Sequence, residues 1–483
     1  MTSKVPYSFA VAFFFAFTFL RVVHADEPTK HRLIVLTDIE ADPDDTQSLV
    51  RLLLYSNQID IEGLVATTSV HMKDRINPES IRSLIRNYRK VRSNLETHEK
   101  GYPEANHLLG LVKDGVAGYG MEAIAPGKSS LGSDWIIEVL ERDDARPVWI
   151  SVWGGANTLA QALMTIRETK TNEEAAELIK KIRVYAISDQ DDSGHWMRSN
   201  FPDLFYIVTP GGYGGSTWSA IYKVLEGDNH DANNAVIGNA WIAEHIQQNH
   251  GPLGSSYPDV TWSMEGDTPA FLALIPNGLN VPDKPNWGGW GGRYELKKPD
   301  PIKGDVGFTG GVPYQPETRK IWSEAVDKWF PLVASSHGRA IRPYDNPIED
   351  NQVSLLRWRE EFQNDFAARM DWCIKPYSEA NHPPVPALSH PERFSVEAGT
   401  WFSLDATGTI DPDDDSLSYF WITYPEAGTC KAEVFNDKNL QALRLKAPEV
   451  EESGTLHFVL KVTDKGTPPL SRYKRVIVTV EPK

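Results

Sequence analysis

The pattern of apolar and polar positions divides the chain into two regions. In the first, short apolar runs rich in branched side chains alternate with stretches in which apolar residues recur at helical spacing. The runs predict buried strands over 33–36, 60–67, 147–152, 183–187 and 205–209, and the helical spacing predicts helices from 45 onward and over 81–91, 134–141, 158–167 and 173–181. Strands that alternate with helices indicate an α/β fold with a mostly parallel sheet covered on both faces.

Residues 317–372 carry a further helical pattern, which predicts helices packed against the sheet. The residues at helical spacing are Trp322, Val326 and Trp329 in the first half and Leu355, Trp358, Phe362 and Phe366 in the second. We therefore expect one large domain over 26–376.

The pattern changes after Lys375. Residues 382–388 (HPPVPAL) are rich in proline, which predicts a stiff linker, and short alternating runs follow it. The runs are 401–404, 417–421, 443–445, 456–462 and 475–480. Their regular spacing predicts an immunoglobulin-like or cadherin-like β-sandwich. We place the linker at 377–387 and the sandwich at 388–483.

Residues 1–25 have the pattern of a signal peptide. Lys4 gives the N-terminal region a positive charge. Residues 10–20 form an apolar segment, and residues 23–25 form a small-residue cleavage site. The apolar run is too short to span a bilayer comfortably. We expect a secreted or periplasmic protein with no membrane partner after cleavage; a retained N-terminal anchor is the alternative.

Charge and cysteine content narrow the function classes. The net charge is −17, and loss of Lys4 and Arg21 with the peptide gives −17 − 2 = −19. This balance argues against a nucleic-acid partner, which needs clustered Lys and Arg, and suits cation binding and a neutral substrate. The two cysteines, Cys373 and Cys430, either form one bridge between the linker and the last domain or remain two thiols.

The most specific chemical signal is the acidic turn between the first strand and the first helix, in RLIVLTDIEADPDDTQSLVRLLL. Its acids are Asp38, Glu40, Asp42, Asp44 and Asp45. So many carboxylates cannot all stay ionised close together unless a hard cation or protonation relieves the repulsion, and Ca²⁺ is the natural cation for oxygen ligands. The competing interpretation is a helix N-terminus decorated with acids, which the macrodipole favours. A separate DPDDD turn, holding Asp411, Asp413 and Asp415, is either a second Ca²⁺ site or a solvated turn.

The turn resembles a known family. Its D-x-E-x-x-x-D-D spacing resembles the D-x-D-x-x-x-D-D signature of nucleoside hydrolases. The longer segments are similar to the bacterial and fungal family described as cellulose-binding proteins with a nucleoside-hydrolase-like domain. These segments are TDIEADPDD, WISVWGGANTLAQAL, YAISDQDDSGHWMR, EGDTPAFLALI and GGWGGRYE.

The resemblance implies roles for individual residues. Glu40, Asp45 and Asp267 would be side-chain ligands of Ca²⁺, Asn157 would offer its backbone carbonyl, and Asp44 would be the base that takes a proton from water. Asp267 and Asn157 are equally placed to cap the helices that follow them. Asp38 matches the first acid of the pattern. We expect it to bind substrate, or else to organise the loop through hydrogen bonds. Asp42 has no counterpart in the pattern and is consistent with a solvated side chain.

Further residues are candidates for substrate binding. Asp191, Asp192, His195 and Trp196 follow a predicted strand end, although Trp196 also suits core packing. Trp287 and Trp290, on the glycine-rich loop 286–292, are candidates for a platform on which a sugar ring stacks. Two departures from the hydrolase pattern stand out. Glu40 replaces an Asp, and Gly266 stands where the hydrolases have the histidine that activates the leaving group.

Three functions remain. The first is a secreted Ca²⁺-dependent glycosidase of the nucleoside hydrolase fold that cleaves a ribosyl or other glycosyl bond of a carbohydrate or nucleoside-like molecule. The alternative is a non-catalytic protein that binds cellulose or another polysaccharide. In the third, Ca²⁺ serves stability alone. The adjacent acids Asp44 and Asp45 favour the first, because a structural ion does not need both.

Overall fold

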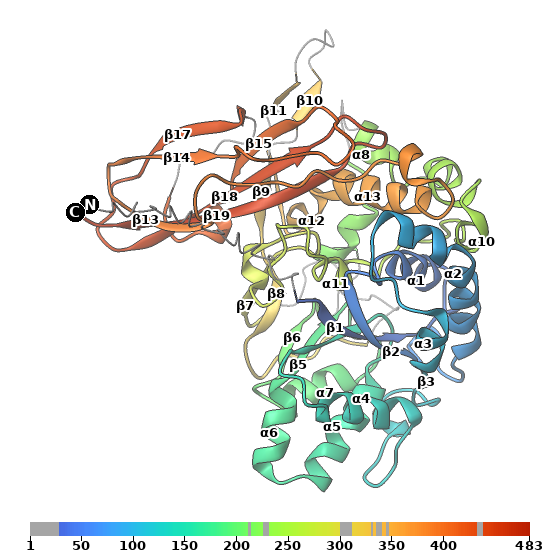
Figure 1. The fold of residues 1–483 in the computed structure, drawn as a ribbon. Coiled ribbons are helices and arrows are strands. Elements are labelled where there is room, and N and C mark those ends of the chain that lie inside the picture. The colour runs from blue at the N-terminus through green and yellow to red at the C-terminus, as the bar shows by residue number, and fades with distance from the viewer. Residues whose placement is uncertain are drawn as a thin grey trace, which may run out of the picture.

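A computed structural model describes residues 29–210, 214–225, 231–299, 312–329, 332–334, 341–343, 347–431 and 438–483. The predicted signal peptide lies outside these residues. The chain forms an α/β domain and a C-terminal β-sandwich, which pack together through the helices between them (Figure 1). Within the described part of the chain, no helix is both long and apolar enough to cross a membrane.

The α/β domain is built on an eight-stranded sheet with the order β3-β2-β1-β4-β5-β6-β8-β7. All neighbouring strands are parallel except β7, which pairs antiparallel with β8 at one edge. The strands are β1 His31–Thr37, β2 Ile59–Ala66, β3 Val112–Asp114, β4 Val148–Val152, β5 Ile182–Ala186, β6 Phe205–Ile207, β7 Tyr294–Lys297 and β8 Ile321–Glu324. The strand order reverses between β1 and β4, which makes the carboxyl ends of these two strands the expected place for a ligand.

Helices cover both faces of this sheet (Figure 1). One face carries α1 Asp44–Leu54, α2 Pro78–His98 and α3 Ala105–Gly110, and the other carries α4 Leu131–Glu141, α5 Asn157–Thr169, α6 Asn172–Lys180 and α7 Ser193–Asn200. Alternate residues of β1 enter separate cores: Leu33 and Val35 face one, Ile34 and Leu36 the other. Burial on both faces explains why β1 is a continuous apolar run in the sequence.

The segment between β6 and the linker is mostly short elements. They are η2 Thr217–Ile221, α8 Asp231–Ala235, α9 Asn239–Ile242, the π-helix Ala243–Gln247, α10 Gly251–Gly254, α11 Pro269–Leu272, η4 Pro285–Trp287, β9 Asp327–Trp329, β10 Leu332–Ala334, β11 Ile341–Pro343, β12 Ile348–Asp350, α12 Val353–Leu356 and α13 Arg359–Asp371. The predicted helix through Trp322 and Trp329 is wrong, because these residues lie in β8 and β9. The helical prediction for the second half of 317–372 is confirmed by α12 and α13.

The C-terminal domain contains a five-stranded sheet, β13-β19-β18-β15-β16, and a two-stranded sheet, β14-β17. The strands are β13 Arg393–Glu397, β14 Trp401–Asp405, β15 Ser418–Thr423, β16 Lys438–Asn439, β17 Ala442–Lys446, β18 Gly454–Thr463 and β19 Ser471–Glu481. Phe402 and Leu443 of the smaller sheet share a core with Trp421, Leu460 and Val478 of the larger one. This facing arrangement is a β-sandwich.

The two domains also share apolar core. Tyr424, Val459 and Tyr473 of the sandwich belong to the same buried cluster as Trp290 and Phe362 of the α/β domain. The two cysteines do not pair: both Cys373 and Cys430 are free thiols.

Candidate functional site

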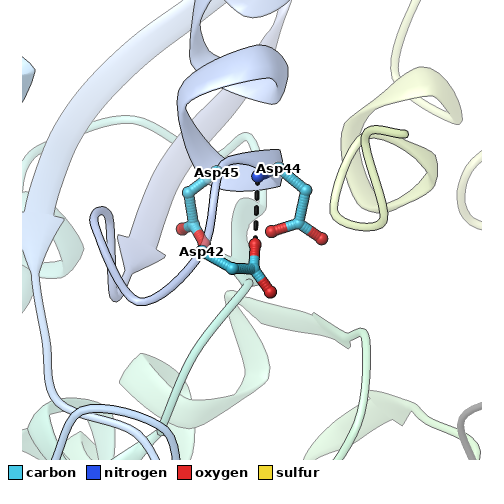
Figure 2. A group of neighbouring side chains, drawn as sticks. All are labelled: Asp42, Asp44 and Asp45. Carbon is cyan, nitrogen blue, oxygen red and sulfur yellow. Dashed lines mark hydrogen bonds between the residues drawn. The ribbon is translucent and has the colours of Figure 1, made fainter. Parts of the chain in front are cut away.

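The acidic turn lies at the carboxyl end of β1, beside the point where the strand order reverses. The chain leaves β1 at Thr37 and enters α1 at Asp44, so the turn brings its acids to the N-terminus of α1. Asp42 Oδ1 accepts a hydrogen bond of 3.0 Å from the backbone N–H of Asp44, which starts the helix. In Figure 2 the carboxylates of Asp42, Asp44 and Asp45 lie close together below the start of α1.

Carboxylate oxygens of Asp42, Asp44 and Asp45 lie within 4.8 Å of one another. Asp38 and Asp267 join these three around a small cavity of about 30 Å³. The other lining residues are His71, Ile187, Gln190 and Trp218. Five carboxylates around a cavity of roughly one water molecule make a strongly anionic site.

Hydrogen bonds hold two of these acids in place. The hydroxyl of Thr37 donates to Asp45 Oδ1 and accepts a 3.1 Å bond from the backbone N–H of Ile39. The hydroxyl of Ser263 donates to Asp44 Oδ2 at 3.3 Å. Asp38 Oδ1 and Asp267 Oδ2 are buried without a hydrogen-bond partner among the described residues. An oxygen buried in this way costs free energy unless another ligand satisfies it.

The electrostatics follow from this crowding. Burial raises the pKa of Asp38, Asp44, Asp45 and Asp267, and the charges of neighbouring aspartates raise each pKa further. The pKa values of Asp44, Asp45 and Asp267 rise well above the usual range of a carboxyl. The protein alone therefore destabilises the charged form of these acids, and a bound cation would reverse this effect.

Three glycines allow the backbone to approach acidic side chains: two of the cavity carboxylates and that of Asp191. A Cβ atom at Gly154 would lie 2.4 Å from Asp38 Oδ1, and one at Gly155 would lie 2.6 Å from Asp191 Oδ2. A Cβ atom at Gly266 would lie 2.6 Å from Asp44 Oδ2. No role was predicted from the sequence for Gly154 and Gly155, although a Gly-Gly pair shortly after a predicted buried strand is a usable signal.

Glu40 is not brought to the cluster. Its backbone φ is +81°, and its exposed side chain accepts a hydrogen bond of 2.5 Å from the hydroxyl of Ser80 on α2. Asp42, which the sequence suggested was solvated, occupies the cavity instead. The prediction that Glu40 joins the other acids is therefore wrong. Its backbone is left-handed and its side chain is exposed, and Asp42 lines the cavity in its place.

Asp267 lies where the resemblance implies a ligand. It lies two residues before α11, whose N-cap is Thr268, and no side-chain hydrogen bond caps this helix. The alternative role of Asp267 as a capping residue is thus not realised, and its carboxylate lines the cavity instead.

Asn157 and Asp191 are buried and contact each other, and neither is among the described residues that line the cavity. The backbone N–H of Asn157 donates to Asp191 Oδ2 at 3.1 Å, and the side-chain amide of Asn157 donates to the carbonyl of Gly118 at 2.8 Å. Asp191 Oδ1 also accepts a 2.9 Å bond from the N–H of Ser193. Burial raises the pKa of Asp191 to about 6. Asn157 does not cap α5, which has no side-chain hydrogen bond at its N-cap.

Asp192, His195 and Trp196 are not among the described residues that line the acidic cavity. Asp192 accepts a 2.8 Å bond from the N–H of Met121 and lines a neighbouring hollow of about 720 Å³ with Lys73 and Tyr119. His195 Nε2 lies 3.3 Å from the carbonyl of Pro316. The ring of Trp196 packs edge-on against Phe201, 5.7 Å between centroids, which supports the packing interpretation.

The structure contradicts the predicted sugar platform at Trp290. Trp290 is fully buried, and its ring meets Tyr473 of β19 edge-on at 6.3 Å. Trp287 is half-buried, and its ring packs at 4.8 Å against His457 of β18. A Cβ atom at Gly288 would lie 2.2 Å from the hydroxyl of Tyr424. The glycine-rich loop is therefore a contact surface for the sandwich, which helps to bury Trp290 and packs against one part of Trp287.

Comparisons with known proteins agree with this fold. Residues 32–294 match the family described as cellulose-binding Sde182, nucleoside hydrolase-like domain, and residues 401–480 match the C-terminal domain of cellulose-binding protein Sde0182. The chain is similar to a solved structure of a nucleoside hydrolase-related hypothetical protein from Saccharophagus degradans that is associated with carbohydrate metabolism. The identity is 33%, the TM-score is 0.76, and the match covers 94% of this chain and 100% of that one.

Other matches are weaker. The effector protein XOO4466 and the type III effector protein XopQ, the latter complexed with adenosine diphosphate ribose, are each 13% identical with a TM-score of 0.26. The match covers 51% of this chain and 81% of XOO4466, and 52% of this chain and 82% of XopQ. Among curated proteins, none matches significantly. The two domain matches and the full-length solved structure show that the chain belongs to the family of cellulose-binding Sde182 proteins with a nucleoside hydrolase-like domain.

Proposed function

We propose that this protein is a secreted, Ca²⁺-dependent glycosidase that hydrolyses a ribosyl or other glycosyl bond. The observation that carries the proposal is the group of five aspartates around the cavity at the carboxyl end of β1, with two buried oxygens that lack a partner among the described residues. The signal-peptide pattern of residues 1–25 supports the secreted location.

The donor set fits a hard cation. Asp38, Asp42, Asp45 and Asp267 offer only carboxylate oxygens, the ligands that Ca²⁺ prefers, and the unpartnered oxygens of Asp38 and Asp267 would gain a partner. When bound, Ca²⁺ would lower the pKa of a coordinated water and would coordinate vicinal sugar hydroxyls.

The side chains of the protein itself activate the water, stabilise the transition state and bind the sugar. Asp44 accepts the proton of the attacking water, and the hydroxyl of Ser263 orients its carboxylate. The negative charge of the cluster stabilises the positive charge that develops at the anomeric carbon in an oxocarbenium-like transition state. Gln190 is held by a 2.6 Å bond from its side-chain amide to the carbonyl of Trp153, which leaves its Oε1 without a partner among the described residues and available to a sugar hydroxyl.

Protonation of the leaving group needs a different residue from the one in the hydrolase pattern. Gly266 replaces the patterned histidine, and a side chain there would collide with Asp44. His71 lines the cavity and is exposed to solvent, so its imidazole is the candidate proton donor.

The second candidate is a protein that binds polysaccharide without hydrolysis. The family description, cellulose-binding, favours it. So does Trp262, which is 82% exposed and precedes Ser263, the residue that contacts Asp44. An exposed ring next in sequence to a residue that contacts Asp44 suits stacking on a sugar.

The deciding experiment measures calcium content and hydrolysis on the purified secreted form. Substrates are 4-nitrophenyl ribosides and other glycosides, inosine and uridine, each with and without EDTA. Asp44→Asn removes the proton acceptor but keeps the size of the side chain, so turnover should fall by at least about 100-fold while the melting temperature changes little. Turnover that survives both EDTA and Asp44→Asn would exclude the mechanism.

Bound calcium without turnover on any substrate would favour the binding function. In that case Trp262→Ala should weaken cellulose binding. The control is Leu131→Ala, which removes another exposed apolar side chain of the α/β domain, 65% exposed at the start of α4.

A further inference from the structure

A second group of oxygen ligands lies where the linker meets the sandwich. Asp411, Asp413 and Asp415, in the loop between β14 and β15, place carboxylate oxygens within 4.8 Å of one another. Such a loop is common without an ion, so the buried groups around it decide whether it is a site.

Asp464 supplies the first of these groups. It follows β18 directly and is completely buried. Its Oδ1 accepts bonds from the N–H groups of Gly466 at 3.1 Å and Leu470 at 2.9 Å, whereas its Oδ2 is buried without a partner among the described residues. Burial raises the pKa of Asp464 to about 6, and the charge of Asp411 adds to this rise.

Asn381, in the linker, supplies the second group. It is 6% exposed, and its side-chain amide donates to Asp464 Oδ1 at 3.1 Å and to the carbonyl of Pro468 at 2.7 Å. Its Oδ1 is buried and unpartnered among the residues that the structure describes. The hydrogen bond between Asn381 and Asp464 thus joins two side chains that each keep one buried oxygen without a partner among the described residues.

Asp411 repeats this arrangement. Its Oδ1 accepts bonds from the N–H groups of Asp413 at 2.9 Å and Asp415 at 3.1 Å, and its Oδ2 is buried without a described partner. The backbone N–H of His382 donates to Asp413 Oδ2 at 2.7 Å, which joins the linker to the loop. Three segments distant in sequence thus each bring one buried, unsatisfied oxygen to the same junction. Three such oxygens are costly unless a cation binds them.

We propose that Asp411, Asp413, Asp464 and Asn381 bind a Ca²⁺ ion at this junction. The donors are all oxygens, which suits Ca²⁺ with its six to eight oxygen ligands and flexible geometry, whereas Zn²⁺ favours nitrogen and sulfur. The site shares no residue with the acidic cavity, so a test of this site does not depend on whether the protein is a glycosidase.

The ion would fix the linker and, through it, the position of the sandwich. Trp372, at the end of α13, donates from Nε1 to the carbonyl of Asn381 at 2.9 Å. The ring of His98, at the end of α2, stacks on His382 with 5.2 Å between centroids. The two linker residues that contact the acids therefore also contact the α/β domain.

Equilibrium dialysis of the full chain against ⁴⁵Ca²⁺ tests the site. In an Asp267→Asn background, which disables the acidic cavity, the protein should retain about one equivalent of calcium, and EDTA should lower its melting temperature. Adding Asp464→Asn should abolish both the binding and the EDTA effect. The matched control is Asp414→Asn, which removes the same charge from an exposed position of the same loop, where φ is +62° and Asn is well tolerated. This control should bind normally.

Calcium binding that is unchanged by Asp464→Asn would overturn the proposal, as would an Asp267→Asn protein that binds no calcium. If Asp464→Asn does not fold, Asp411→Asn is judged by the same criteria, because its loop lies nearer the surface. Loss of binding in Asp414→Asn as well would indicate diffuse attraction of cations to an acidic surface, and would equally reject the site.

Discussion

Arg51 and Glu265 form an ion pair of 2.9 Å in which both side chains are completely buried. Arg51 lies on α1, the helix that begins with Asp44 and Asp45, and Glu265 lies two residues before Asp267. The pair therefore fixes the spacing between the two segments that bring acids to the cavity.

Glu265→Gln should lower the free energy of unfolding by about 3–5 kcal/mol, because it leaves the guanidinium of Arg51 buried without its counter-charge. Chemical denaturation measures this change. Glu295→Gln is the control: Glu295 also pairs with an arginine, Arg293, at 3.2 Å, but its side chain is 50% exposed. This change should cost less than about 1 kcal/mol. Equal losses in the two variants would contradict the role given to the buried pair.

Gly266→Ala should impair the acidic cavity more than the fold. The new Cβ would lie 2.6 Å from Asp44 Oδ2 and 3.1 Å from the ring of Trp218, so the carboxylate of Asp44 must move. Misplacement of a reacting group by about 1 Å can reduce turnover about 100-fold. Steady-state kinetics on whichever glycoside is cleaved measures the effect. Gly110→Ala is the control, because nothing lies within 4 Å of its Cβ position; turnover should stay normal there.

Trp290→Ala should destabilise the protein by about 3–5 kcal/mol, since it opens a cavity between the domains. Trp262→Ala should change stability by less than about 0.5 kcal/mol, because Trp262 is 82% exposed. Thermal and chemical unfolding of the two variants distinguish an interdomain anchor from a surface ring. A mild effect of Trp290→Ala would mean that the domains contribute little to each other's stability.

His457 should make the protein sensitive to acid. Burial, with Arg475 and Arg393 adding to it, lowers the pKa of His457 to about 3. The unfolded chain, with a histidine pKa near 6.5, then binds more protons between about pH 6.5 and pH 3, so stability falls as the pH falls through this window. From pH 7 to pH 5 the loss from this group reaches about 2 kcal/mol. Unfolding of His457→Gln at both pH values should show a smaller difference; an unchanged difference would refute the assignment.

Much of the α/β domain was predictable because its signals are local. The apolar run of β1 and the helical spacing of α2 and α5 each lie within one element. The helix predicted through Trp322 and Trp329 was wrong because their spacing also fits a helix. In the structure Trp322 pairs with residues distant in the sequence, Ile207 and Leu296. Sheet pairing across such separations overrides local periodicity.

In the candidate site, too, the features that depend on local sequence were predictable and those that depend on distant contacts or unusual backbone angles were not. A cluster of acids after β1 was predictable from the motif, and Asp44, Asp45 and Asp267 all line the cavity. That Asp42 and not Glu40 lines the cavity was not predictable. Glu40 has a positive φ, and the sequence gives no sign of this because glutamate rarely adopts such a conformation. The burial of Trp290 depends on Tyr473, a residue of the other domain.

The shared core has a consequence for what cleavage of the chain would do. Tyr424 and Tyr473 are buried among residues of the α/β domain as deeply as residues within either domain. A protease that cut the proline-rich segment would sever the covalent connection and leave this apolar contact whole. The fragments should stay together as a nicked complex, and the sandwich cannot be detached as an independent binding tag without stripping a hydrophobic face from its neighbour.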